Sequence, residues 1–159
     1  MSTPTPYGAL AMDYRIEVIT LPVADVDRAI RFYTGQAGFA LDVDYRPNDG
    51  FRVVQLTPPG SACSIQLGTG LTGAAPGSAR AGYLVVADIE AAHRELAGRG
   101  VPVSEVRHKK SVDWQGDFAP GADPRRRDYA SFLDFADPDG NTWVVQERGF
   151  SAPSGNRRT

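Results

Sequence analysis

Proton transfer near neutral pH is the chemistry that the two histidines of this chain could perform, and His108 is the better candidate. It lies at the end of a strand-like run, directly before a long irregular segment. An unperturbed imidazole titrates close to neutrality, so His108 is a candidate catalytic acid or base, with Asp113 or Asp128 as an orienting carboxylate. A solvated basic turn between Arg107 and Lys109 is the alternative reading of the same residues.

Two glutamines are the next candidates, because each lies in a strand-like run. Side chains of a strand point alternately to its two faces, so Gln66 shares a face with Ser64, and Gln146 shares one with Thr142 and Val144. A buried amide without a partner costs about 1 to 3 kcal/mol, so the two amides either bond each other, bind water or await a ligand's carbonyl or hydroxyl. The predicted inward-facing set is Ile16, Val18, Thr20, Ser64, Gln66, Tyr83, Val85, Thr142, Val144 and Gln146.

An internal repeat organises the elements that must position these residues. The segment from Val23 to Arg31 recurs 63 positions later, from Val86 to Arg94. In each copy a strand is followed by an aspartate suited to cap a helix and then by apolar residues at helical spacing. Turn-rich segments separate the later runs. The predicted strands are 14–23, 39–45, 51–57 and 62–68 in the first copy and 82–86, 101–108, 129–135 and 142–147 in the second, with helices after Asp25 and over 88–97.

The chain is therefore predicted to be α+β, with two tandem βαβββ modules. The predicted boundaries are a flexible N-terminus 1–12, a first module 13–70, a linker 71–80, a second module 81–148 with a long loop 109–128, and a flexible tail 149–159.

The duplicated order, together with two motifs, resembles the glyoxalase/bleomycin-resistance/dioxygenase superfamily, also called the vicinal oxygen chelate (VOC) superfamily. The motifs are the run from Leu21 to Tyr33 and the sequence Asp137-Pro138-Asp139-Gly140-Asn141. The resemblance implies a curved mixed sheet around a cup-shaped cavity, which Gln66 and Gln146 would both face. It implies no single reaction, since such members include lyases, isomerases, dioxygenases and drug-binding proteins.

Metal-binding members of this family carry His, Glu or Gln at four positions of the cup. By this resemblance the positions fall on Val18 and Ala81, seven residues before the two capping aspartates, and on Gln66 and Val144. Only Gln66 has a donor atom, and one neutral amide would hold a divalent ion too weakly. Glu147 is expected on the opposite face of its strand from Val144. The sequence thus predicts no metal and no cofactor.

The loop 109–128 is long for a compact domain and carries aromatic side chains, which is typical of a lid or binding loop. Trp114 and Phe118 lie in it and Tyr129 follows it. We expect the loop aromatics Trp114 and Phe118 to fold over the cup mouth, although a neighbouring subunit is an alternative. Arg125 to Arg127 could clamp an anion or could form a solvated loop or dimer contact.

Composition excludes several classes of protein. The 159 residues carry a formal charge of -2, which does not favour nucleic acid, and no apolar run is long enough to span a membrane. A single cysteine, Cys63, excludes an internal disulfide and agrees with a reducing compartment. We expect a cytoplasmic protein, and the family resemblance implies a homodimer, with the cup formed within one chain or between two.

Two functions follow. The first is metal-free binding or sequestration of a small, aromatic organic molecule in an apolar cup, with ligand contacts from Tyr45, Gln66, Tyr83, Trp114, Tyr129, Val144 and Gln146. The alternative is a metal-independent isomerase, epimerase or cyclase with His108 as acid or base and a glutamine polarising an oxygen. A metal-dependent lyase or ring-cleaving dioxygenase ranks last, because it would need donors at positions that lack them.

Overall fold

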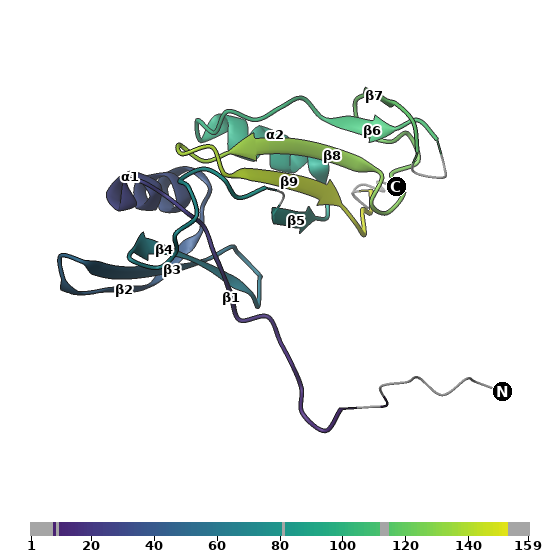
Figure 1. Ribbon diagram of the computed structural model, residues 1–159. Helices are drawn as coiled ribbons and strands as arrows, with labels where there is room; N and C mark the ends of the chain where they lie inside the picture. Colours follow the sequence, from purple (N-terminus) through teal and green to yellow (C-terminus); the bar gives the residue numbers. More distant parts are fainter. Residues whose placement is uncertain (1–7, 9, 81, 112–114, 153–159) are drawn as a thin grey trace, which may run out of the picture.

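Two mixed β-sheets form the protein, one from each copy of the repeat (Figure 1). The computed structural model describes residues 8, 10–80, 82–111 and 115–152. The first sheet has the order β1-β4-β3-β2 and the second β5-β9-β8-β6-β7. The strands are β1 Val18–Thr20, β2 Ala40–Asn48, β3 Phe51–Thr57, β4 Ser64–Thr69, β5 Gly82–Val86, β6 Arg107–Lys109, β7 Phe118–Pro120, β8 Ser131–Ala136 and β9 Thr142–Glu147. The α+β class and the tandem βαβββ order are confirmed.

The helix of each module begins at the aspartate that the repeat marks as a cap. The Asp25 carboxylate accepts a hydrogen bond from the backbone N–H of Arg28 at 3.0 Å, and α1 (Val26–Ile30) continues as a π-helical segment, η1 (Arg31–Gln36). The Asp88 carboxylate accepts from two backbone N–H groups at the start of α2 (Ile89–Gly98). These bonds satisfy donors that a helix N-terminus would otherwise leave free.

One hydrophobic core joins the two sheets. Phe32 packs on Phe135 with ring centroids 6.3 Å apart, and Tyr33 packs on Trp143 at 6.2 Å. The buried Tyr33 hydroxyl donates to the Asp137 carboxylate at 2.8 Å and accepts from Trp143 Nε1 at 2.9 Å. Burial raises the pKa of this hydroxyl far above its ordinary value, so it stays a neutral donor. The modules therefore meet through the faces of their sheets that carry the helices.

The first strand is shorter than its sequence pattern indicates. We expected a strand over 14–23, but β1 begins at Val18, which pairs in parallel with Ser64 at the start of β4. The Glu17 carbonyl still accepts a hydrogen bond from the Ser64 N–H at 3.0 Å, but the described residues before Glu17 pair with no strand, and Tyr14 and Ile16 stay 78% and 70% exposed. This segment runs away from the body of the molecule (Figure 1). Within the described part of one chain, the alternating apolar side chains of this segment therefore form no buried strand face.

The second module also departs from the predicted strand pattern. The strand expected over 101–108 is reduced to β6, and Val103 forms only an isolated bridge with Phe135. Pro102 has no N–H for a ladder, which explains the break. The loop 109–128, expected to lack regular structure, contains β7, which pairs with β6. Among the described residues, no helix is both long and apolar enough to cross a membrane.

Candidate functional site

Each sheet has one face on the shared core and one face without a helix over it. In the first sheet, Val54, Leu56, Ile65 and Leu67 are buried in the core. Residues that alternate with them point the other way. We call this the first open face, made of Val18, Thr20, Val43, Tyr45, Val53, Gln55, Thr57, Ser64 and Gln66.

The second sheet repeats this division. Leu133, Phe135, Trp143 and Val145 are buried in the core, and Glu147 is buried on the same side, as the alternation predicted. We call the opposite side the second open face. It consists of Tyr83, Val85, Arg107, Lys109, Phe118, Phe132, Asp134, Ala136, Thr142, Val144 and Gln146. Because both core faces enclose one core, the two open faces point away from each other within a chain.

The strand registers show which positions of the two modules correspond. Gln66 pairs with Thr20, and Val144 pairs with Tyr83, which lies 63 positions after Thr20. Gln66 and Val144 are therefore equivalent, as the family resemblance implied. Val18 also lies on the first open face, and Ala81 falls outside the described residues.

The donor set at these positions does not fit a divalent metal. Val18 and Val144 offer no ligand atom, and the Gln66 amide already donates through Nε2 to Thr20 Oγ1 at 2.8 Å. In the described part of the chain, no group of three or more His, Cys, Asp or Glu side chains is arranged to hold an ion. A metal at the family position would have one amide oxygen for a ligand, and we derive no chemistry through it.

The predicted ligand-contacting residues divide between the two sheets. Tyr45 and Gln66 lie on the first open face, while Tyr83, Val144 and Gln146 lie on the second. Tyr45 and Tyr83 are 56% and 59% exposed. The two glutamines therefore do not face each other within one chain.

Two further residues predicted to contact the ligand, Trp114 and Tyr129, lie in or next to the loop 109–128. Tyr129 precedes β8 with a positive φ of 64°, is exposed, and has the Arg148 guanidinium 5.9 Å from its ring. Trp114 lies outside the described residues. The ligand contacts of Trp114 and Tyr129, and the cover of Trp114 and Phe118 over the cup mouth, stay predictions.

His108 and Gln146 lie on opposite sides of the second sheet. His108 pairs with Ser131, whose side chain is buried in the core, whereas the neighbouring Arg107 pairs with Phe132 on the second open face. His108 Nδ1 forms a hydrogen bond with the Gly121 carbonyl at 2.8 Å. The 63-position spacing of the repeat would make His108 the counterpart of Tyr45. The register that pairs Tyr45 with Val53 and Arg107 with Phe132 makes Arg107 the counterpart instead. A shift of one residue in a strand exchanges its faces, so His108 lies on the other face.

The second open face carries a cluster of aromatic and basic side chains that the sequence did not predict. Phe118 meets Phe132 edge to face, with ring centroids 5.8 Å apart. The Arg107 guanidinium carbon lies 4.9 Å from the Phe118 centroid, and Lys109 Nζ lies 4.2 Å from it. These distances are within the range of cation–π attraction. The pairing of β6 with β7, absent from the predicted elements, is what brings Phe118 to the sheet.

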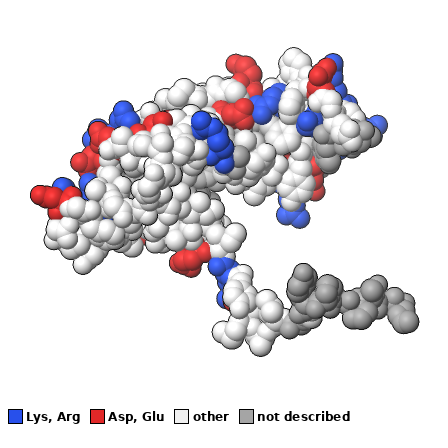
Figure 2. Space-filling model, viewed as in Figure 1, with Lys and Arg blue, Asp and Glu red and all other residues white. Residues whose placement is uncertain are grey.

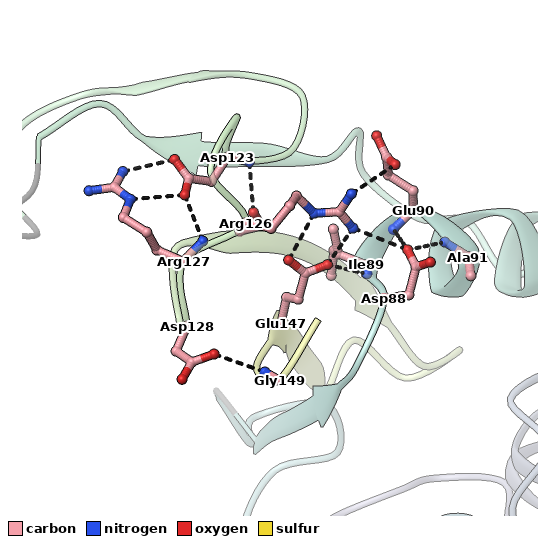
Figure 3. A network of polar contacts seen from close by, with 11 residues as sticks. Asp88, Ile89, Glu90, Ala91, Asp123, Arg126, Arg127, Asp128, Glu147 and Gly149 are labelled. Atoms are coloured by element: carbon pink, nitrogen blue, oxygen red, sulfur yellow. Dashed lines mark hydrogen bonds and ion pairs between the residues drawn. The ribbon is translucent and has the colours of Figure 1, made fainter. Parts of the chain in front are cut away.

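Two of the three consecutive arginines are held by carboxylates (Figure 3). Arg126, with a φ of 49°, donates to the buried Glu147 carboxylate and also contacts Asp88 and Glu90. Arg127 donates to Asp123 and lowers the pKa of that carboxyl to about 2. These two arginines brace the loop against the sheet, so the expected anion clamp would retain only Arg125.

A cavity of about 260 Å³ lies between the two modules, on the core side of the sheets. Apolar side chains dominate its wall, with Ile19, Leu21, Ile65, Leu84 and Trp143 among them. Ligand pockets for drug-sized molecules are commonly about 300 to 1,000 Å³. This cavity is therefore small for such a ligand, and the open faces offer the larger surfaces.

The surface carries no extended region of one charge in the view of Figure 2. Acidic and basic side chains are scattered in small groups of both signs, and uncharged surface separates them (Figure 2). Nucleic-acid binding relies on a continuous basic surface. This view of the molecule presents none.

Solved structures of similar fold cover most of the chain. An antibiotic binding protein, TnmS3 from Streptomyces sp. CB03234, is 27% identical with a TM-score of 0.65, over 87% of this chain and 98% of its own. A glyoxalase/bleomycin resistance protein from the same organism is 28% identical with a TM-score of 0.62, over 84% and 100%. A superfamily member from Sphaerobacter thermophilus DSM 20745 is 27% identical with a TM-score of 0.61, over 87% and 100%.

No curated protein matches the chain. The family model described as Glyoxalase/Bleomycin resistance protein/Dioxygenase superfamily matches residues 15–145. That match spans both modules, including the capped helices, the paired registers and the motif from Asp137 to Asn141. The chain belongs to the glyoxalase/bleomycin resistance protein/dioxygenase superfamily.

Proposed function

We propose that this protein binds a small, aromatic organic molecule between open sheet faces, without a metal. The observation that carries the proposal is the composition of the second open face. Tyr83 and Val85 are 59% and 58% exposed there, beside the aromatic pair Phe118 and Phe132. Large apolar side chains grouped on one surface are typical of a binding site, because their exposure to water is unfavourable.

The first open face supports the same function with a different composition. Val43 and Tyr45 are exposed on it, and Gln66 supplies an amide oxygen that is not used by its bond to Thr20. A mostly apolar surface with a few polar groups is what a small organic ligand requires. TnmS3, an antibiotic binding protein that is 27% identical to this chain, is a precedent for such a ligand.

We further propose that the binding form is a homodimer. The two open faces of one chain diverge, because both sheets turn their other faces to one core. Enclosing a ligand on two sides therefore needs an open face from a second copy. Tyr14 and Ile16, exposed before β1, supply further apolar surface for that contact. The lone thiol of Cys63 agrees with a reducing compartment, and we expect the dimer to act in the cytoplasm.

An enzymatic role for His108 has less support. Its imidazole and the Gln146 amide lie on opposite faces of the second sheet, so the two cannot act on one molecule bound to that face. General acid or base catalysis requires the group within hydrogen-bond reach of the transferred proton. The metal-independent isomerase, epimerase or cyclase therefore ranks below binding.

The test combines light scattering with calorimetry on the full chain. We expect a particle of twice the 17.1 kDa chain mass and measurable heat on titration with 1-naphthamide, a neutral aromatic probe. Val85→Asp places a charge on the second open face and should abolish both signals while leaving the circular dichroism spectrum unchanged. Ala97→Asp, on the exposed side of α2, is the matched control. A monomer that binds no probe, or a Val85→Asp variant that still dimerises and binds, contradicts the proposal.

A further inference from the structure

The aromatic cluster on the second open face holds more positive than negative charge. Arg107 and Lys109 both lie against the Phe118 ring, so two cations share one aromatic side chain. Arg107 is neutralised by Asp134, through a two-point contact of 3.1 Å and 3.0 Å between guanidinium and carboxylate. Among the ion pairs of the described residues, none involves Lys109. The ammonium of Lys109 is therefore a positive charge held beside an aromatic surface.

The local surroundings increase this positive charge. A surface cavity at the end of β6 extends from Lys109 to the other side of the sheet, where His108 lies, and is lined by Lys110, Arg125 and the ion pair between Arg127 and Asp123. Lys110 and Arg125 likewise take part in none of the described ion pairs. A cationic ligand would meet repulsion here, and a neutral one would leave the Lys109 charge unused.

We infer that the ligand is an aromatic anion, that is, a ring system bearing a carboxylate, sulfonate or phenolate group. This inference rests on the proposed function, since it specifies the chemical class bound at the same face. The ring lies on Phe118 and Phe132, and the anionic group accepts hydrogen bonds from Lys109 Nζ. Gln146, which pairs with Phe132 across the strands, adds an amide donor beside the ring.

The pairing of Arg107 with Asp134 makes Arg107 a positioning residue in this scheme. Its guanidinium is fixed by the carboxylate and lies 4.9 Å from the Phe118 centroid and 5.9 Å from the Phe132 centroid. It therefore holds the two rings in place and contributes little net charge. Removing the Asp134 charge would expose a second cation to the ligand.

The test compares two probes of nearly equal shape, 1-naphthoate and 1-naphthamide, by calorimetric titration of the full chain. We expect naphthoate to bind about tenfold more tightly, which corresponds to 1.4 kcal/mol. Lys109→Met keeps the length of the side chain and should remove this difference while leaving the naphthamide affinity unchanged. Asp134→Asn should strengthen naphthoate binding about threefold, as expected for one additional partly exposed charge. Higher ionic strength should weaken naphthoate binding only.

The matched control is Arg94→Met on α2, where an exposed cation is lost on the helix side of the second sheet and not on the open face that carries Phe118; it should change neither affinity. Phe118→Leu should weaken both probes, since it removes the ring and spares the charges. Equal affinities for the two probes, or an unchanged naphthoate affinity in Lys109→Met, overturns this inference and leaves the proposed function intact. Failure of both probes to bind overturns the proposed function, and this inference with it.

Discussion

Replacing Glu147 by Gln tests how the second module is braced. The Glu147 side chain is fully buried, its Oε2 accepts from the Ile89 backbone N–H at 2.9 Å, and its Oε1 accepts from Arg126 Nε at 2.9 Å (Figure 3). Glutamine keeps the shape but removes the charge, and its NH₂ group must face one of these donors. The variant therefore loses an ion pair and acquires two opposed donors in the interior.

The magnitude follows from the burial of the two partners. Removing one partner of a buried ion pair costs about 3 to 5 kcal/mol. Arg126 is 17% exposed and keeps contacts with Asp88 and Glu90, so we expect the lower end, about 3 kcal/mol. For a chain of this size, each kcal/mol shifts the unfolding temperature by about 2 to 4 °C. The Tm of Glu147→Gln should fall by roughly 6 to 12 °C.

Urea and thermal unfolding, followed by circular dichroism, measure the effect. Glu95→Gln, an exposed position on α2, is the control and should change the free energy of unfolding by less than about 0.5 kcal/mol. In a double-mutant cycle, Arg126→Met with Glu147→Leu should cost less than the sum of the single variants, because no buried charge is left alone. A loss below about 1 kcal/mol in Glu147→Gln would show that Arg126 relaxes into solvent, and the reasoning would be wrong.

Two further predictions concern the pH dependence of stability and a close backbone contact. The Arg127 guanidinium lowers the pKa of the buried Asp123 to about 2, below its value in the unfolded chain, so the pair stabilises the fold above about pH 4. This contribution, about 2 kcal/mol, should be lost as the pH falls from 4 to 2, and urea titrations of Asp123→Asn should lack that part of the dependence. Gly77 has a φ of 79°, and a Cβ there would lie 1.9 Å from the Asp139 carbonyl oxygen, so Gly77→Ala should destabilise by more than about 2 kcal/mol. Gly73→Ala, where a Cβ would meet nothing within 4 Å, should be nearly neutral in the same thermal unfolding assay.

Local sequence signals predicted several elements well. Strands β3, β5 and β9 have the predicted bounds, and both helices begin at the capping aspartates of the repeat. The position of Glu147 on the opposite face from Gln146 followed from alternation alone, whereas its burial did not. These features depend on the order of neighbouring residues, because side-chain direction has a period of two in a strand and capping is a contact within four residues.

Features that depend on distant partners were missed or misplaced. The face of His108 depends on its pairing with Ser131, 23 positions away, and the strand that aligns them is only three residues long. Phe118 reaches the sheet only because β7 pairs with β6. A short strand carries too weak an alternation to define its register, so neither contact has a local signal.

The sequence by itself determined the two modules, the composition of each strand face and the lack of donors at Val18, Ala81 and Val144. The tertiary structure decided which faces are covered and which are open. It also decided how Arg107 and Lys109 contact Phe118, and which carboxylates pair with Arg126. The physical reason is that covalent order restricts each strand to two faces, whereas the choice between them is made by the shared core. Once both sheets bury their apolar faces against the same aromatic side chains, the remaining faces must turn outward.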